Sequence, residues 1–197
     1  VFNMVSGVIH PSAGAIRLFG TDITGLSPDR VAHSGIARTF QNIRLFRNLT
    51  VLDNVLVGLH LRREANVVEA LLALPRHSAA EAQMAATATQ LLGEIGLADG
   101  SHYRASALPY GEQRRLEIAR ALSTKPALLV LDEPAAGMNP AETEDRMHLI
   151  TDIRERFSLT ILLIEHEMKV VMGICERMTV LDHGETIAEG TPKEIQC

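Results

Sequence analysis

The pattern of apolar positions changes near residue 123. Before it, apolar residues recur mostly at helical spacing, whereas three continuous apolar runs follow, separated by helical segments. The runs cover residues 127–132, 159–166 and 177–182. Continuous apolar strands that alternate with helices are typical of a parallel sheet covered on both faces. The pattern therefore predicts an α/β domain in which these three runs are strands of one mainly parallel sheet.

Capping residues mark the starts of several predicted helices. Ser27, Thr50, Ser78 and Asn139 each stand just before a segment with helical periodicity, and their side chains can accept hydrogen bonds from the first turn. The expected helices cover residues 27–35, 50–63, 78–96, 112–122, 139–157 and 167–175, and a short strand is expected at 15–20. Residues 51–122 are therefore expected to be mostly helical.

Both ends of the chain show incomplete helical patterns. The opening VFNMVSG has helical apolar spacing that ends at Gly7, and no capping residue precedes Val1. The closing TPKEIQC begins a helix with Thr191 as N-cap, Pro192 in the first turn and Glu194 at the capping-box position. That helix stops after one turn, so we expect the sequence to be a fragment of a longer chain.

Composition narrows the class of protein. With 197 residues, 46% of them hydrophobic, the chain can bury a core. Its net charge of −5 and its scattered basic residues argue against nucleic-acid binding. No apolar run approaches the ~18 residues that span a bilayer, so we expect any membrane association to go through a partner. Cys175 and Cys197 form no metal or disulfide pattern, which fits a reducing compartment.

Two adjacent carboxylates, Asp132 and Glu133, end the first apolar run, and Glu165 and His166 end the second. In parallel sheets the functional side chains lie beyond the carboxyl ends of the strands. Carboxylate oxygens suit Mg²⁺, so magnesium-nucleotide chemistry is the main hypothesis for this edge. The alternative is that the paired acids cap the next helix, where its dipole would favour them.

Nucleotide chemistry also needs a loop that binds phosphates, of the form Gly-x-x-x-x-Gly-Lys-Ser/Thr. The three lysines, Lys125, Lys169 and Lys193, follow Thr, Met and Pro, so none of them can be the lysine of such a loop. We expect the loop immediately before Val1, with the first helix directing its N-terminus at the phosphates.

Five segments together resemble the ATP-binding subunits of ABC transporters, beginning just after the Walker A motif. They are a Q-loop ARTFQNIRLF (37–46), a signature region LPYGEQRRLEIARAL (108–122), a Walker B strand LLVLDEP (128–134), a D-loop region AAGMNP (135–140) and a switch-histidine segment LLIEHEM (162–168). In this order and spacing they are very specific, and they extend along essentially the whole chain. The residues of these segments are most similar to those of the ATP-binding subunits of branched-chain amino-acid importers.

The resemblance implies a RecA-like P-loop NTPase core, residues 1–50 and 123–197, with an inserted α-helical subdomain, residues 51–122. It implies ATP and Mg²⁺ as cofactors. The intact protein would hydrolyse ATP, whereas residues 1–197 alone, without the phosphate loop, would not.

The same resemblance assigns roles at the strand ends. Asp132 would hold Mg²⁺, Glu133 would polarise the attacking water, and Gln41 would reach the metal or that water. His166 would hydrogen-bond the terminal phosphate of the nucleotide. For Gln41 the plainer reading is an ordinary polar loop residue, and for His166 a structural or solvated histidine. Zinc binding at His166 is rejected because the two-histidine spacing of zinc proteases is absent.

The signature segment departs from the family's Leu-Ser-Gly-Gly-Gln, since it reads Leu108, Pro109, Tyr110, Gly111 and Glu112. The resemblance implies that it binds the nucleotide held by the opposite subunit. Pro109 offers neither a hydroxyl nor an N–H. Glu112 would repel phosphate by ~4 kcal/mol at ~4 Å and an effective dielectric of ~20, so its side chain should point away. We expect Arg114, Arg115 and Arg120 to form mostly the solvated and salt-bridged face of this helix.

The implied partners are a second ABC ATPase subunit, identical or homologous, a transmembrane permease and, indirectly, a substrate-binding protein, with no nucleic acid. ATP-driven closure of the two subunits would drive the permease at the cytoplasmic face of the inner membrane, with branched-chain amino acids as the expected cargo. One alternative is a soluble ABC-type ATPase of DNA repair or translation, which would typically add a coiled coil, zinc modules or a second cassette. The other is a non-catalytic fragment that serves in assembly.

Overall fold

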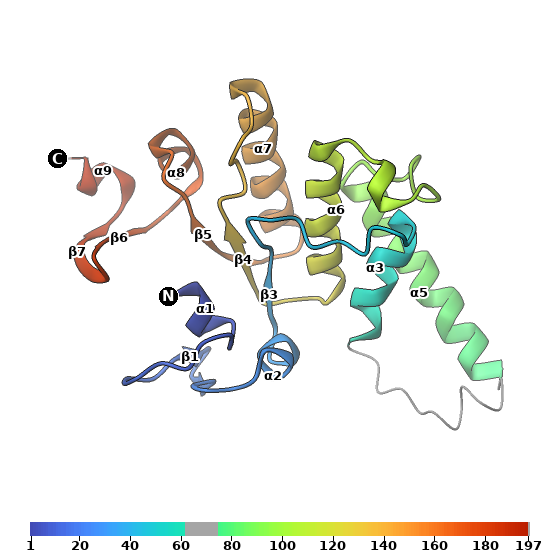
Figure 1. Ribbon diagram of the computed structural model, residues 1–197, viewed down its shortest axis with the longest axis horizontal. Helices are drawn as coiled ribbons and strands as arrows, with labels where there is room; N and C mark the ends of the chain where they lie inside the picture. The colour runs from blue at the N-terminus through green and yellow to red at the C-terminus, as the bar shows by residue number, and fades with distance from the viewer. Residues whose placement is uncertain (62–74, 197) are drawn as a thin grey trace.

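The structure is a computed structural model that describes residues 1–61 and 75–196 (Figure 1). Three strands near the middle of an elongated molecule, β3 (Ile36–Arg38), β4 (Leu128–Asp132) and β5 (Thr160–Ile164), form a parallel sheet in the order β3-β4-β5. The predicted α/β class with a parallel sheet is thus confirmed. Strand β3 was not predicted, because three residues are too short a run to show a periodicity.

Strand β4 is buried on both faces because it lies between two hydrophobic clusters. Leu129 and Leu131 belong to a large cluster shared with helices, whereas Val130 between them belongs to a smaller cluster on the opposite face. Successive side chains of a strand point to opposite faces, and all three are fully buried. This arrangement explains why the run is continuously apolar rather than alternating.

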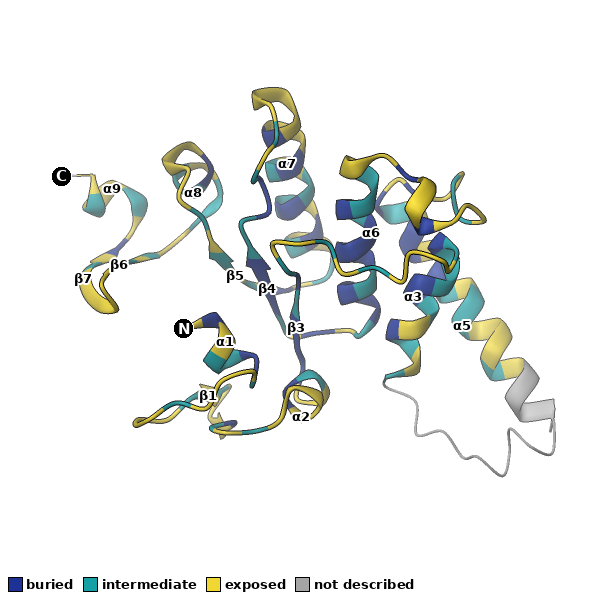
Figure 2. Cartoon of the chain, viewed as in Figure 1, coloured by how far each residue is buried: buried dark blue, intermediate teal, exposed yellow. Residues whose placement is uncertain are grey.

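Four helices pack around the larger cluster: α3 (Val51–His60), α5 (Pro75–Glu94), α6 (Tyr110–Ser123) and α7 (Pro140–Arg156). The buried residues concentrate on α6 and on the inner sides of α3 and α7 (Figure 2). The short 3-10 helix η1 (Ala105–Ala107) precedes α6. The division into a core and a helical subdomain stays a prediction, because this cluster runs without a break from α3 and α5 to β4.

The smaller cluster lies under the sheet. Helices α1 (Phe2–Val5) and α2 (Pro28–His33) and the loop residue Ile23 contribute side chains that pack beneath β3 and β4. Strands β1 (Arg17–Leu18) and β2 (Thr21–Asp22) pair antiparallel as a hairpin. Its two turn residues, Phe19 and Gly20, have φ of 46° and 84°. The strand expected at 15–20 is therefore only two residues long, because the chain reverses at this turn.

The expectation that residues 177–182 extend the parallel sheet was wrong. Strand β6 (Met178–Asp182) pairs antiparallel with β7 (Glu185–Gly190), and β7 was not predicted. The turn His183-Gly184 between them has φ of 48° and 87°, as two-residue hairpin turns require. Helix α8 (Met168–Ile174) precedes this hairpin and α9 (Pro192–Ile195) follows it. An apolar run predicts a strand but not the strand that it pairs with.

Most of the predicted helix caps are confirmed. Thr50, Asn139 and Thr191 each form a capping box with the residue three positions later. Ser78 does not begin a helix, because α5 starts earlier, at Pro75, and runs through it. Residues 62–63 of the helix expected at 50–63 lie outside the described residues. Among the described helices none is long and apolar enough to cross a membrane.

Candidate functional site

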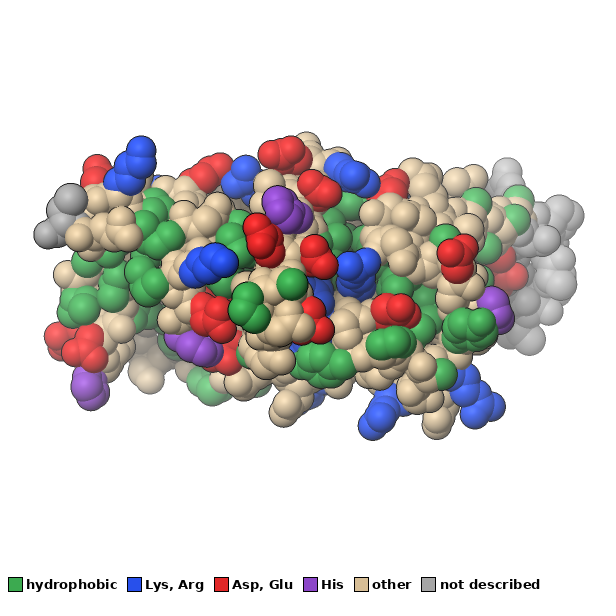
Figure 3. Space-filling view, turned by 90° about the horizontal axis from the view of Figure 1, so that it is seen from above, with side chains coloured by type: hydrophobic (Ala, Val, Ile, Leu, Met, Phe, Trp, Pro, Cys, Tyr) green, Lys and Arg blue, Asp and Glu red, His purple; other side chains and the backbone are tan. Residues whose placement is uncertain are grey.

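The candidate site lies where the three parallel strands end. Because parallel strands present their carboxyl ends at one edge, the residues that follow β3, β4 and β5 meet there. Gln41 follows β3, Asp132 and Glu133 end β4, and His166 follows β5. Figure 3 looks onto this side of the molecule, where acidic side chains surround a histidine near the middle of the face.

Glu133 is at the centre of this cluster. The side-chain amide Nε2 of Gln41 donates a hydrogen bond to Glu133 Oε2 at 2.9 Å. His166 Nδ1 lies 3.6 Å from the other carboxylate oxygen, Oε1. The Glu133 side chain is 25% exposed and that of His166 is 69% exposed, so a small molecule can reach both. Gln41 and His166, far apart in the sequence, thus meet at the carboxylate of Glu133, although the catalytic roles of all three residues stay predictions.

The backbone of Glu133 adopts a conformation that L-residues rarely take. Its φ is +46°, which costs a non-glycine residue about 1–2 kcal/mol. Its N–H donates to the carbonyl of Ile164 at 2.9 Å, and its own carbonyl accepts from the N–H of Ala136 at 3.1 Å. The turn ends β4 sharply at this residue. Strained backbone of this kind clusters at functional sites, which supports a functional reading of Glu133.

The alternative that the acid pair caps the next helix fails. Helix α7 begins at Pro140, and Asn139 is its N-cap, with its side chain accepting hydrogen bonds from the N–H groups of Ala141 and Glu142. Asp132 and Glu133 are therefore more than a turn away from the helix that they would have to cap.

Asp132 is paired with Arg38, a residue that the sequence analysis missed. Arg38 Nη2 donates to Asp132 Oδ2 at 2.9 Å, and Nη1 donates to Asn3 Oδ1 at 2.7 Å and Ser6 Oγ at 2.9 Å. The guanidinium also lies over the ring of Phe40, at 5.0 Å from its centroid. The sequence carries no signal for this role, because β3, which ends at Arg38, is too short to show a periodicity. Arg38 joins helix α1 to the tip of β4.

The donor set suits Mg²⁺ better than a metal held by protein ligands alone. Within residues 1–61 and 75–196 no group of three or more His, Cys, Asp or Glu is placed to hold a metal ion. Mg²⁺ is usually bound by one or two carboxylates together with substrate phosphates. A single strand-end carboxylate, that of Asp132, fits this requirement.

The expectation of a solvated face was wrong for Arg114 and Arg120, whereas the expected salt bridge is present at Arg114, which pairs with Glu117. Arg114 is only 5% exposed, and its Nη1 donates to the carbonyl of Phe40 at 2.8 Å. Arg120 is partly buried, its guanidinium lies 5.7 Å from the centroid of Phe46, and burial lowers its pKa. Both side chains reach the segment that follows β3. The spacing of arginines along a helix does not reveal a contact with the segment that follows β3, because that segment has no regular structure.

The five signature residues lie at the start of α6, whose N-cap is Pro109. Leu108 is buried, whereas Pro109, Tyr110 and Gly111 are exposed and Glu112 is half-buried. The structure does not place them in the hydrogen bonds around Glu133 described above. Tyr110 is connected to that cluster only indirectly, since its hydroxyl accepts a hydrogen bond from Arg114 Nε at 3.1 Å. Their role in nucleotide binding stays a prediction.

A buried cation from α7 lies against the signature. Arg146 is 5% exposed, and its Nη2 donates to the carbonyl of Gly111 at 3.5 Å. Burial, followed by repulsion from Arg115 and Arg114, lowers the pKa of Arg146 well below its ordinary value, to about 10. The sequence analysis gave this residue no role.

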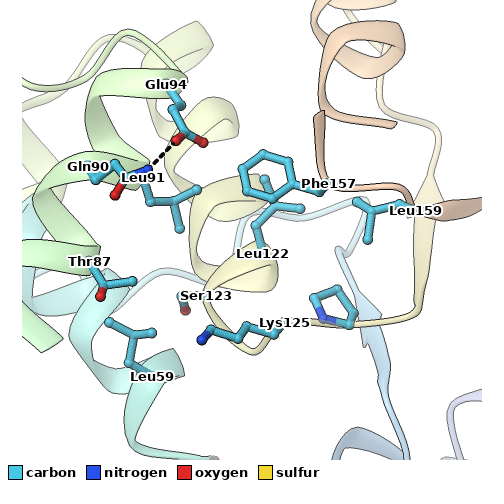
Figure 4. A pocket seen from close by; sticks show the side chains of 11 residues that line it. Leu59, Thr87, Gln90, Leu91, Glu94, Leu122, Ser123, Lys125, Phe157 and Leu159 are labelled. Atoms are coloured by element: carbon cyan, nitrogen blue, oxygen red, sulfur yellow. Dashed lines mark hydrogen bonds between the residues drawn. The ribbon is translucent and has the colours of Figure 1, made fainter. Parts of the chain in front are cut away.

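A cavity of about 390 Å³ lies away from these residues, between α3, α5, α6 and the turn before β5 (Figure 4). The side chain of Lys125 extends into it among apolar groups. The polar side chains of its wall bond locally: Ser123 to the carbonyl of Arg120, and Gln90 to Glu94. The cavity is thus separate from the cluster around Glu133.

Comparison with known proteins identifies the family. The family model described as ABC transporter matches residues 1–136. Over 196 residues the chain is 43% identical to the high-affinity branched-chain amino acid transport ATP-binding protein BraF of Pseudomonas aeruginosa and 44% identical to LivG of Escherichia coli K12. Both alignments cover 100% of this chain and 77% of the relative.

The solved structures agree with the sequence relatives. The ADP conformation of MJ1267, an ATP-binding cassette of an ABC transporter, superimposes with a TM-score of 0.81 at 29% identity, covering 99% of this chain and 76% of that one. The fold, the order of the motifs and the identity to both transport proteins point the same way. The chain belongs to the ATP-binding subunits of the ABC transporter family.

Proposed function

We propose that the chain is the ATP-hydrolysing part of an ABC importer for branched-chain amino acids, the cargo class for which BraF and LivG are named. The observation that supports hydrolysis most directly is the placement of Gln41 and His166 on the two oxygens of Glu133, next to Asp132. This arrangement brings one carboxylate with a fixed orientation to the edge of the sheet.

In this proposal Glu133 acts as general base and takes a proton from the attacking water. The Nε2 of Gln41, 2.9 Å from Glu133 Oε2, holds the carboxylate in place. His166, 69% exposed and close to Oε1, lies on the outer side, where it can donate to a phosphate oxygen. Bound ATP with Mg²⁺ supplies the phosphoryl group and the cation that offsets its charge.

Asp132 would hold Mg²⁺ through water, and Arg38 fixes the position of Asp132. Arg38 reaches Asp132, Asn3 and Ser6 together, so it also orients helix α1 relative to β4. The signature residues Leu108 to Glu112 would bind the nucleotide of a second ABC ATPase subunit. Closure of the two subunits would drive a permease at the cytoplasmic face of the membrane, supplied by a substrate-binding protein.

Turnover requires a phosphate loop, which residues 1–197 do not contain. We therefore expect no hydrolysis by these residues alone, and the assays below use protein in which such a loop precedes Val1. Robust turnover by residues 1–197 would contradict this expectation.

The catalytic assignment is tested by Glu133→Gln, which keeps the size of the side chain and its ability to accept a hydrogen bond but removes its basicity. Loss of a general base lowers turnover by about 10²–10⁴-fold. Glu144→Gln is the matched control, since Glu144 is exposed on α7. An unchanged rate for Glu133→Gln, measured by phosphate release with ATP binding checked separately, would remove Glu133 from the mechanism.

The cargo class needs a separate experiment. The protein with its phosphate loop is produced in Escherichia coli that lacks LivG, and uptake of radiolabelled leucine, isoleucine and valine is measured. Restored uptake, lost again in Glu133→Gln, would support the importer. Failure to restore uptake by a protein that hydrolyses ATP would refute the assignment of cargo and leave the ATPase assignment intact.

A further inference from the structure

Helix α6 contains a buried ion pair that the proposed reaction does not use. Arg114 and Glu117 are three residues apart, and Arg114 Nη1 lies 3.4 Å from Glu117 Oε2. Their side chains are 5% and 2% exposed. Removing two charges from water is costly unless other hydrogen bonds satisfy them. We call these two residues the α6 clamp.

The remaining hydrogen bonds of the α6 clamp go to the backbone that follows β3. Arg114 Nη1 donates to the carbonyl of Phe40 at 2.8 Å and its Nη2 donates to that of Gln41. Glu117 Oε1 accepts from the N–H groups of Phe40 at 3.5 Å and Arg44 at 3.2 Å. The clamp thus replaces the backbone partners that regular secondary structure would otherwise provide.

At its other end the α6 clamp contacts the signature. The Nε of Arg114 donates to the hydroxyl of Tyr110 at 3.1 Å, and the guanidinium carbon lies 5.5 Å from the centroid of the ring. Tyr110 itself is 52% exposed. One guanidinium therefore binds an exposed signature side chain and the backbone of Gln41, whose side chain binds Glu133.

We propose that Arg114 is a positioning residue that sets the placement of Gln41 against Glu133 and makes it depend on Tyr110. A displacement of Tyr110 moves the guanidinium, and the guanidinium moves the backbone of Gln41. The planar fork suits this role, because its nitrogens bond several acceptors at fixed angles, which a single ammonium does not. The inference rests on the proposed function, since it concerns the same carboxylate.

Arg114→Lys separates positioning from fold stability. It keeps a cation next to Glu117 but loses the fork. Misplacement of a catalytic group by about 1 Å can lower the rate about 100-fold, so we expect kcat to fall about 10–100-fold, with KM for ATP changed less than about twofold. In nucleotide-free protein the side-chain amide NMR signal of Gln41 should shift. Arg115→Met is the control, a larger change at the next position of α6.

A second variant tests the same proposal with less risk that the protein fails to fold. Arg114→Met/Glu117→Leu replaces both charges by apolar side chains and leaves no buried charge unpaired, so the fold is retained more readily than in either single variant. It should show the same loss of kcat and the same shift of the Gln41 signal. Tyr110→Phe removes only the hydroxyl, and it should shift the Gln41 signal in the same direction by a smaller amount.

The outcomes distinguish the proposed positioning role of Arg114 from the proposed role of Glu133 in hydrolysis. If Arg114→Lys lowers the melting temperature but leaves both kcat and the Gln41 signal as in the wild type, the α6 clamp only stabilises the fold and the inference is overturned. An unshifted Gln41 signal in Tyr110→Phe would refute the link to the signature. A wild-type rate in Glu133→Gln would instead overturn the proposed function, while the nucleotide-free Gln41 signal still reports on the clamp.

Discussion

Arg146 should destabilise the fold in which it is buried. Burial and the neighbouring Arg115 and Arg114 lower its pKa well below the ordinary value of an arginine, to about 10. Each tenfold change in proton affinity is worth about 1.4 kcal/mol, so holding this charge in the folded state costs about 3 kcal/mol. Its hydrogen bond to the carbonyl of Gly111, 3.5 Å long, offsets only part of that cost.

The perturbation is Arg146→Met, which keeps an unbranched side chain of similar helix propensity. We expect the free energy of unfolding to rise by about 1–3 kcal/mol, or about 2–4 °C in melting temperature for each kcal/mol. Urea titrations followed by circular dichroism measure it. The control is Arg156→Met on the same helix. Arg156 is 56% exposed and 3.9 Å from Asp152, so a change within about 0.5 kcal/mol is expected.

The pH dependence provides an independent check. Below pH 10 the guanidinium is charged in both folded and unfolded states, so the whole cost is present at neutral pH. As pH rises above about 10, the folded state releases this proton before the unfolded state does, and the cost declines. The advantage of Arg146→Met should therefore shrink above pH 10. A loss of more than about 1 kcal/mol at pH 7, with the control unchanged, would refute the reasoning.

Three further outcomes follow from the packing. Gly58→Ala should lower stability by about 1–3 kcal/mol in thermal unfolding, because its methyl group would lie 2.7 Å from the carbonyl of Arg120, whereas Gly93→Ala, with nothing within 4 Å, should be neutral or stabilising. Asn139→Ala removes the N-cap of α7 and should cost about 1 kcal/mol in urea unfolding, and a neutral result would contradict the cap. Burial and Glu165 raise the pKa of the Cys175 thiol, so its alkylation by iodoacetamide, followed by mass spectrometry, should be slow at pH 7 and still accelerate above pH 9, whereas rapid alkylation at pH 7 would show an exposed thiolate.

Several features of the protein could be predicted from the sequence because their causes are local. The capping boxes at Thr50 and Asn139 depend on residues three apart, and the apolar run of β4 reflects burial on both faces. The same expectation was wrong for β5, which leaves Leu162 and Ile164 on one face exposed. The position of Glu133 and His166 beyond those strands follows from the geometry of parallel sheets. The motifs in their order identified the family for the same reason, since each motif is a continuous stretch of sequence.

Other features were decided only by the tertiary structure. Strand β6 pairs with β7 rather than with the parallel sheet, and Arg38 bonds Asp132 although 94 positions separate them. A pattern of apolar residues predicts a strand, but neither which strand lies beside it nor whether both of its faces are covered, since β6 leaves Leu181 exposed. A long arginine side chain can extend into water or fold inward. Arg114 is buried because Glu117 and the backbone carbonyls of Phe40 and Gln41 offer it acceptors. The pairing of β6 and the burial of Arg114 both depend on groups distant in the sequence, so only the completed fold determines them.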